Sequence, residues 1–178
     1  MEQSVECVQD GEKILFKTPI FDIIERFQKG RSGKMLPRFV VRNRGAVAIL
    51  PVLEDGRILL IKQFRIAAKQ YIYEIPAGVR EPNEDVSVTA ARELKEETGY
   101  QAKELVPIQS FYSSPGIFNE RLHLFLATGL TAGEQELEDG EDLTVEYRTP
   151  DEIRGMIRRN EIVDGKTLVA LLWYLAMK

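Results

Sequence analysis

The sequence has 178 residues, 44% hydrophobic and 29% charged, which fits one globular domain and excludes a disordered chain. Its formal net charge of -4 provides no basic surface for a nucleic-acid backbone, so nucleic-acid partners are not expected. No apolar stretch reaches the ~20 residues of a membrane helix and the first residues lack a secretory-signal pattern, so we expect a cytoplasmic protein with no membrane partner.

The N-terminal part of the chain is rich in predicted strands. Short strands are expected within residues 5–27, followed by a polar loop over 28–33. Apolar stretches at 46–53 and 58–64 flank an Asp-Gly turn, which predicts a hairpin because Asp-Gly supplies the positive φ that such turns require. Residues 71–76 are expected to form another strand.

A helix is predicted over residues 84–98. Val86, Ala90 and Leu94 recur every four residues and so form one apolar stripe. Asn83 is the expected N-cap, and Gly99 is the residue type that commonly ends a helix.

The C-terminal half continues the alternation of strands and helices. Strands are expected at 106–112, 122–128 and 143–147, with an acidic loop over 134–142. Thr149 and Glu152 form the capping-box pattern around Pro150, so a helix should run from Pro150 to about Arg159, before a final helix over 166–177. These elements predict an α+β protein with a β-rich N-terminal arm (1–43) followed by the main domain (44–178).

Carboxylates are the expected source of the chemistry. Cys7 and His123 are each the only residue of their type, which excludes an intrachain disulfide and sites with several thiolates or imidazoles. In the predicted helix Glu93 and Glu97 stack on one face with Glu96 beside them, and such a cluster suits a hard divalent cation such as Mg²⁺. The alternative is a solvated acidic face.

The residues around this cluster resemble a known motif. From Gly78 to Tyr100 the chain reads GVREPNEDVSVTAARELKEETGY, which matches the Nudix box Gly-x5-Glu-x7-Arg-Glu-U-x-Glu-Glu-x-Gly-U at every fixed position. The one departure is Tyr100, which is bulkier than the usual aliphatic residue. The chain therefore resembles Nudix hydrolases, and the resemblance implies their fold, a mixed β-sheet sandwiched between helices.

The resemblance also implies site residues. Glu93, Glu97 and the backbone carbonyl of Ala77 would ligate Mg²⁺, with Mn²⁺ as an alternative, and Glu96 would assist in binding or catalysis. Arg92 would orient the glutamates. Gly78 would let the backbone approach a phosphate closely.

Features outside the box resemble the branch that hydrolyses ADP-ribose. Pro115 lies sixteen residues after Gly99, Glu74–Gly78 looks like the entry to the box in this branch, and Gln63–Arg65 looks like one of its strand ends. Arg65 and Arg44 would contact phosphate or ribose, with Glu74 and Gly78 also at the substrate. Pro115 with Gly116 also fits a plain turn, and either arginine also fits a surface position.

The general base is expected in the acidic loop. Glu141 is the first choice, followed by Asp139 and Glu138, with Glu120 as a candidate from a neighbouring loop. The alternative for each is a solvated carboxylate.

The branch resemblance implies the substrate, a nucleoside diphosphate sugar, and a homodimer whose N-terminal strands pack against the partner. The resemblance leaves two alternatives open. One is a Nudix hydrolase of nucleoside triphosphates or dinucleoside polyphosphates. The other is a nucleotide-sugar sensor without turnover.

Overall fold

The computed structural model describes residues 11–177, which form two compact units. Unit 1 contains the described residues up to Gly45 together with Tyr112–Arg121, and unit 2 contains Ala46–Phe111 and the residues from Leu122 onward. Of the segment 5–27, in which short strands were expected, residues 5–10 lie outside the described residues. None of the helices between residues 11 and 177 is long and apolar enough to cross a membrane.

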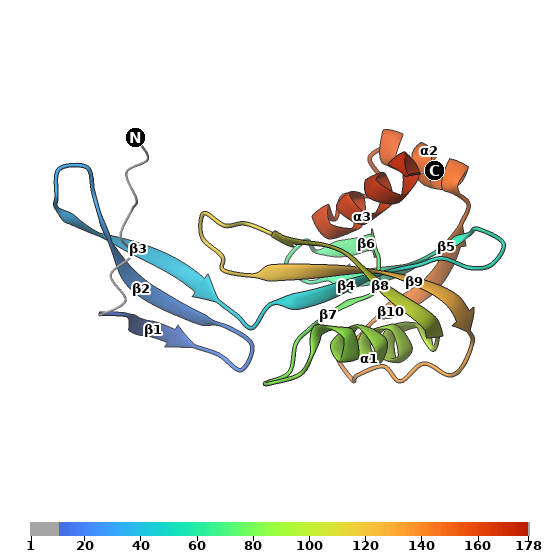
Figure 1. Cartoon of the computed structure of the whole chain (residues 1–178), viewed down its shortest axis with the longest axis horizontal. Coiled ribbons are helices and arrows are strands. Elements are labelled where there is room, and N and C mark those ends of the chain that lie inside the picture. Colours follow the sequence, from blue (N-terminus) through green and yellow to red (C-terminus); the bar gives the residue numbers. More distant parts are fainter. Residues whose placement is uncertain (1–10, 178) are drawn as a thin grey trace. The chain divides into compact units, whose positions relative to one another are not determined.

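Strands β1 to β7 precede the first helix, and three more strands separate it from the two C-terminal helices (Figure 1). They are β1 (Lys13–Lys17), β2 (Asp22–Lys29), β3 (Met35–Arg42), β4 (Ala46–Pro51), β5 (Ile58–Arg65), β6 (Gln70–Glu74), β7 (Ala77–Val79), α1 (Val86–Thr98), β8 (Gln101–Tyr112), β9 (Arg121–Thr131), β10 (Leu143–Arg148), α2 (Pro150–Arg158) and α3 (Gly165–Ala176).

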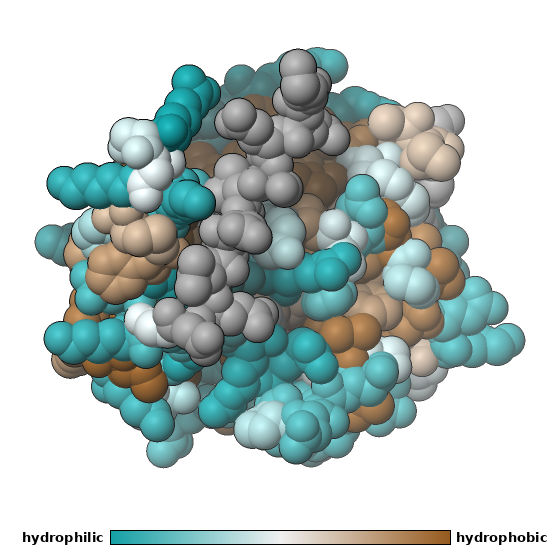
Figure 2. Space-filling model, turned by 60° about the vertical axis from the view of Figure 1, so that its left-hand side comes forward, coloured by the Kyte–Doolittle hydropathy of each residue, from teal (hydrophilic) through white to brown (hydrophobic). Residues whose placement is uncertain are grey.

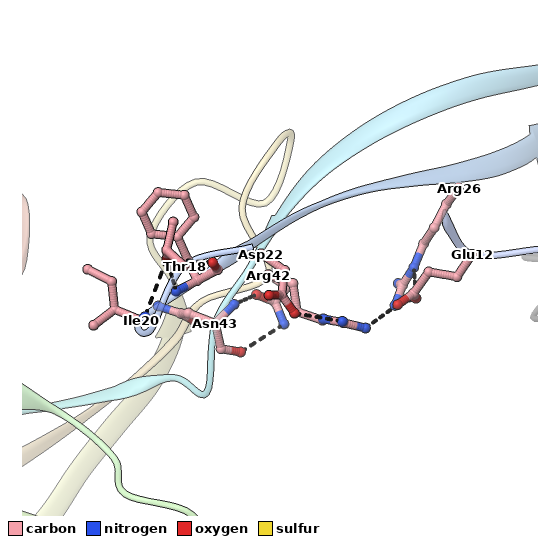
Figure 3. Close-up of polar contacts among 9 residues, drawn as sticks. Glu12, Thr18, Ile20, Asp22, Arg26, Arg42 and Asn43 are labelled. Carbon is pink, nitrogen blue, oxygen red and sulfur yellow. Dashed lines mark hydrogen bonds and ion pairs between the residues drawn. The ribbon is translucent and has the colours of Figure 1, made fainter. Parts of the chain in front are cut away.

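Unit 1 is built on an antiparallel sheet in the order β1-β2-β3. The loop of residues 112–121 joins this sheet at its β3 end, where the amide of Val41 donates to the carbonyl of Ile117 over 2.8 Å. One face of the sheet carries an ionic network, in which Glu12 pairs with Arg26 and Arg42, and Arg42 also pairs with Asp22 (Figure 3). The strand register places Phe16, Phe27, Met35 and Phe39 on the opposite face.

Unit 2 has two sheets between helices. One sheet has the order β7-β4-β9-β8, with β4 and β9 parallel, and the other has the order β10-β5-β6. Alternate side chains of β4 point in opposite directions: Val47 and Ile49 pack with α1, whereas Ala48 and Leu50 belong to the core beneath α2 and α3. Because β4 is apolar on both faces, each of its faces is covered by helices (Figure 1).

The hairpin predicted over residues 46–64 is wrong. Its turn forms, with Gly56 at φ 83° and the amide of Gly56 donating to the carbonyl of Leu53. However, β4 and β5 lie in different sheets and meet only at a bridge between Val52 and Ile58. Each strand is paired on both edges by other strands, which leaves no edge for the hairpin.

Helix α1 begins slightly later than predicted. Its N-cap is Asp85, whose side chain accepts a hydrogen bond from the amide of Ser87, whereas the expected cap, Asn83, has a left-handed φ of 63°. The predicted end is correct, because Gly99 adopts φ 75° and its amide bonds to the carbonyl of Lys95. The predicted capping box of Thr149 and Glu152 also forms, at the start of α2.

Gly99 is a position where we expect a large effect of one methyl group. A Cβ there would lie 2.6 Å from the carbonyl oxygen of Gly133, and its left-handed φ is unfavourable for other residues. Gly99→Ala should lower the free energy of unfolding by at least about 1–2 kcal/mol, measured by urea denaturation. Gly165→Ala is the matched control, because a Cβ at Gly165 meets no atom within 4 Å. Equal stabilities for the two variants would contradict this explanation.

Candidate active site

Helix α1 and strand β7 bring the predicted metal ligands together. The stripe of Ala90 and Leu94 is fully buried against the sheet, and this packing turns Glu93 and Glu97 toward the segment Ala77–Gly78. The amide of Ala77 donates to Oε2 of Glu97 over 2.9 Å. A Cβ built on Gly78 would lie 1.9 Å from Cδ of Glu93, so the carboxylate of Glu93 occupies the space that a side chain at residue 78 would need.

The carboxylates of Glu93 and Glu97 are buried and resist ionisation. Their residues are 8% and 2% exposed. Burial raises the pKa of Glu93 to about 7, although Arg92 opposes the shift, and raises the pKa of Glu97 to about 8, although the amide of Ala77 opposes it. Neighbouring negative charges add to both shifts: Glu96 and Glu141 raise the pKa of Glu93, and Glu93 and Glu141 raise the pKa of Glu97. A cation between the two carboxylates would favour their ionised forms and so lower both pKa values.

Arg92 organises the other carboxylates of the motif. Its Nη1 atom lies 2.8 Å from Oε1 of Glu93 and donates to Oε2 of Glu96 over 2.7 Å. Its Nε and Nη2 atoms donate to Glu84, and this contact lowers the pKa of Glu84 to about 2. Glu96 is therefore engaged by Arg92 in this structure.

The fit to a divalent cation rests on the buried pair of carboxylates. Within residues 11–177 no three Asp, Glu, His or Cys side chains are grouped closely enough to form a metal cluster by themselves. Glu93 and Glu97 nevertheless offer the hard oxygen donors that Mg²⁺ prefers, and Mg²⁺ usually completes its shell with water and substrate phosphate. The donor chemistry therefore fits such an ion, with Glu93 and Glu97 as its side-chain ligands.

Arg65 and Glu74 form a pair beside this site. Nε and Nη2 of Arg65 donate to the two carboxylate oxygens of Glu74 over 2.6 and 2.8 Å. Glu74 is fully buried, whereas the side chain of Arg65 is 40% exposed. The charge of Glu97 contributes to the raised pKa of Arg65, after the larger contribution of Glu74, so the guanidinium lies within electrostatic reach of Glu97.

Lys166 is a functional candidate that the sequence analysis missed. Its Nζ atom donates to Oε2 of Glu74 and, over 3.1 Å, to Oδ2 of Asp164. No local pattern marked this residue, because its partner Glu74 lies 92 positions earlier in the chain.

The acidic loop is attached to the end of α1. The side-chain amide of Gln135 donates to the carbonyl of Glu97 over 2.6 Å, and the amide of Glu136 donates to the carbonyl of Glu96 over 2.9 Å. Further along, Glu141 is partly buried and its charge acts on Glu93 and Glu97, whereas Glu138 and Asp139 are exposed. Of the three loop candidates for the general base, Glu141 is thus the one that the electrostatics link to the site.

Two of the expected site residues, Arg44 and Glu120, belong to unit 1. Oε1 of Glu120 accepts a hydrogen bond from the side-chain amide of Asn43 over 2.8 Å. Arg44 lines a hollow of about 520 Å³ together with Lys17–Asp22, Arg42 and Asn43. All other expected site residues belong to unit 2.

Comparison with solved structures supports the fold. A solved structure described as an ADP compounds hydrolase matches with a TM-score of 0.79 over 96% of this chain and 91% of that chain, at 21% identity. This match confirms the predicted fold class.

Sequence relatives cover most of the chain. An "ADP-ribose pyrophosphatase" of Bacillus subtilis (strain 168) is 40% identical over 99% of this chain and 96% of its own length. A "Methanol dehydrogenase activator" of Bacillus methanolicus is 38% identical over 79% of this chain and 77% of its own length. The model of the NUDIX domain matches residues 42–171. The chain therefore belongs to the Nudix family, and the prediction of a Nudix hydrolase is confirmed.

Proposed function

We propose that the protein hydrolyses the pyrophosphate bond of ADP-ribose or a related nucleoside diphosphate sugar, using Mg²⁺ or Mn²⁺. The observation that carries the proposal is the buried pair Glu93 and Glu97 packed against Gly78. The 40% identity to a protein named ADP-ribose pyrophosphatase supports the choice of substrate. The cytosol, the expected compartment, stays a prediction.

The proposed roles follow from the position and charge of each residue. Glu93 and Glu97, with the carbonyl of Ala77, would hold the cation, which would supply positive charge to offset that of the diphosphate and favour deprotonation of the attacking water. Arg65 uses two nitrogens for Glu74 and retains Nη1, which has no hydrogen-bond partner among residues 11–177, for a phosphate or ribose oxygen. Arg44 stays a proposed substrate contact, as the family resemblance implies.

Glu141 acts as the general base in this proposal. It accepts a proton from the attacking water, whose oxygen forms the new bond to phosphorus while the bridging P–O bond breaks. The products are a nucleoside monophosphate and a sugar phosphate. Glu96 assists from its position beside Arg92, and Glu120 stays the alternative base.

We also propose a homodimer formed through the arm. Phe16, Phe27, Met35 and Phe39 share one face of the β1-β2-β3 sheet and are 38–57% exposed. Figure 2, in which the left-hand side of Figure 1 comes forward, shows hydrophobic surface among the charged residues on this side of the molecule. A small sheet with an apolar face needs a covering partner, and the family resemblance makes a second copy the proposed one.

Substrate hydrolysis tests the main proposal. We expect AMP and ribose 5-phosphate from ADP-ribose with Mg²⁺, and a dATP reaction that is slower under the same conditions. Inorganic pyrophosphate from dATP, with no product from ADP-ribose or GDP-mannose, would instead identify a nucleoside triphosphate hydrolase. Binding of these sugar nucleotides without any turnover would identify a sensor.

The variant Glu97→Gln tests the carboxylate on which this activity depends. It keeps the shape of the side chain but removes a charged ligand, so kcat should fall by more than the roughly 10–100-fold typical of residues outside the ligand shell. Glu104→Gln, an exposed glutamate of β8, is the matched control and should keep the activity. Equal activity of both variants would contradict the role of Glu97.

The raised pKa values of Glu93 and Glu97 predict how stability depends on pH. Without divalent cations, the unfolded chain releases these protons near pH 4.5 but the folded protein only near pH 7 to 8. The free energy of unfolding should therefore fall as pH rises through this interval, and Mg²⁺ should stabilise the protein more at high pH than at low pH. Urea denaturation of the wild type and of Glu97→Gln measures both effects. If the free energy of unfolding depended on pH equally in the wild type and in Glu97→Gln, the raised pKa of Glu97 would be contradicted.

Sedimentation equilibrium tests the proposed dimer. The wild type should have twice the chain mass of 20.3 kDa. Phe39→Glu places a charge on the apolar face and should shift the protein toward the monomer, because an unpaired charge is costly to bury. A monomeric wild type would refute the dimer, and a dimer unaffected by Phe39→Glu would refute this interface.

A further inference from the structure

A set of four charges, of which only Arg65 is substantially exposed, connects α3 with the strands of the site. Glu74 is fully buried, and its carboxylate accepts hydrogen bonds from both Arg65 and Lys166. Lys166 in turn binds Asp164, and only 13% of its side chain is exposed. Two carboxylates and two cations make the set neutral, which is the condition under which buried charges are tolerated.

The first turn of α3 also fixes the backbone next to Glu74. Asp164 caps the helix by accepting from the amide and the hydroxyl of Thr167. Oγ1 of Thr167 accepts a hydrogen bond from the amide of Ile75 over 2.9 Å. Lys166 and Thr167 therefore hold two consecutive residues, Glu74 and Ile75, which only Pro76 separates from the Ala77–Gly78 segment that meets Glu93 and Glu97.

Lys166 determines how Glu74 can orient Arg65. Because Lys166 occupies Oε2 of Glu74, this oxygen is shared between the ammonium and Nη2 of Arg65. The remaining nitrogen of Arg65, Nη1, is left for a ligand. Without Lys166, Glu74 would keep a single cationic partner, and the guanidinium would be drawn further onto the carboxylate.

We propose that Lys166 is a positioning residue for the reaction, which acts on the substrate through Glu74 and Arg65. The proposal rests on the proposed function, in which Arg65 binds the diphosphate or ribose. It assigns to the C-terminal helix a role in substrate affinity that local sequence motifs do not reveal.

A double-mutant cycle tests this coupling. KM and kcat for ADP-ribose are measured for the wild type, Lys166→Met, Arg65→Ala and the double variant. Lys166→Met should raise KM about tenfold with a smaller effect on kcat, the effect expected from losing one charge-assisted hydrogen bond. In the Arg65→Ala background the same change should alter KM by less than about twofold, because the residue through which Lys166 acts is gone.

Controls separate positioning from stability. Lys166→Arg keeps the cation and should restore most of the affinity, while Arg154→Met removes a cation from an exposed pair of α2 and should leave KM unchanged. Thermal unfolding confirms that each variant is folded, and Lys166→Gln replaces Lys166→Met if the latter does not fold. The proposal would be overturned if the double variant raised KM by the product of the two single-variant effects. It would also be overturned if a folded Lys166→Met or Lys166→Gln variant had an unchanged KM. A wild type without activity on any sugar nucleotide would instead refute the proposed function.

Discussion

Helix α1 lies so close to strand β7 that the carboxylate of Glu93 fills the position of a side chain at residue 78. This approach requires glycine, and it buries two carboxylates of one helix face in a setting where ionisation is unfavourable. A cation bound between the two carboxylates would offset the unfavourable free energy of ionising them in this buried position. Gly78 and Glu93 are thus both required by the same close contact between α1 and β7.

Three further sets of contacts in unit 2 hold the elements around this contact in place. The core of Val47, Ile49 and Leu94 fixes the position of α1 on the sheet. The bonds from Gln135 and Glu136 attach the acidic loop to the last turn of the same helix. Asp164, Lys166 and Thr167 hold the segment around Glu74 and Ile75 from the other side. Within unit 2, the acidic loop is thus attached to α1, and the first turn of α3 is attached to the residues that precede β7.

Local sequence patterns predicted the features that depend on near neighbours. The spacing of Ala90 and Leu94, the stop at Gly99 and the capping box at Thr149 all identify their elements correctly. The Asp-Gly turn was also correct, but the pairing of its flanking strands was not, because long-range partners decide which sheet a strand joins. Lys166 escaped detection for the same reason: its partner Glu74 is distant in sequence. The Nudix motif identified the carboxylates, but their burial and coupling to Glu141 required the structure.

In the proposed site, Glu93 and Glu97 would hold a cation beside the segment Ala77–Gly78. Anomalous diffraction from crystals of the protein soaked in Mn²⁺ locates the ion directly, because Mn²⁺ uses the same oxygen donors as Mg²⁺. We expect an anomalous peak in contact with the carboxylates of both Glu93 and Glu97. A well-occupied peak elsewhere, with these two carboxylates bound only to protein atoms, would contradict this expectation.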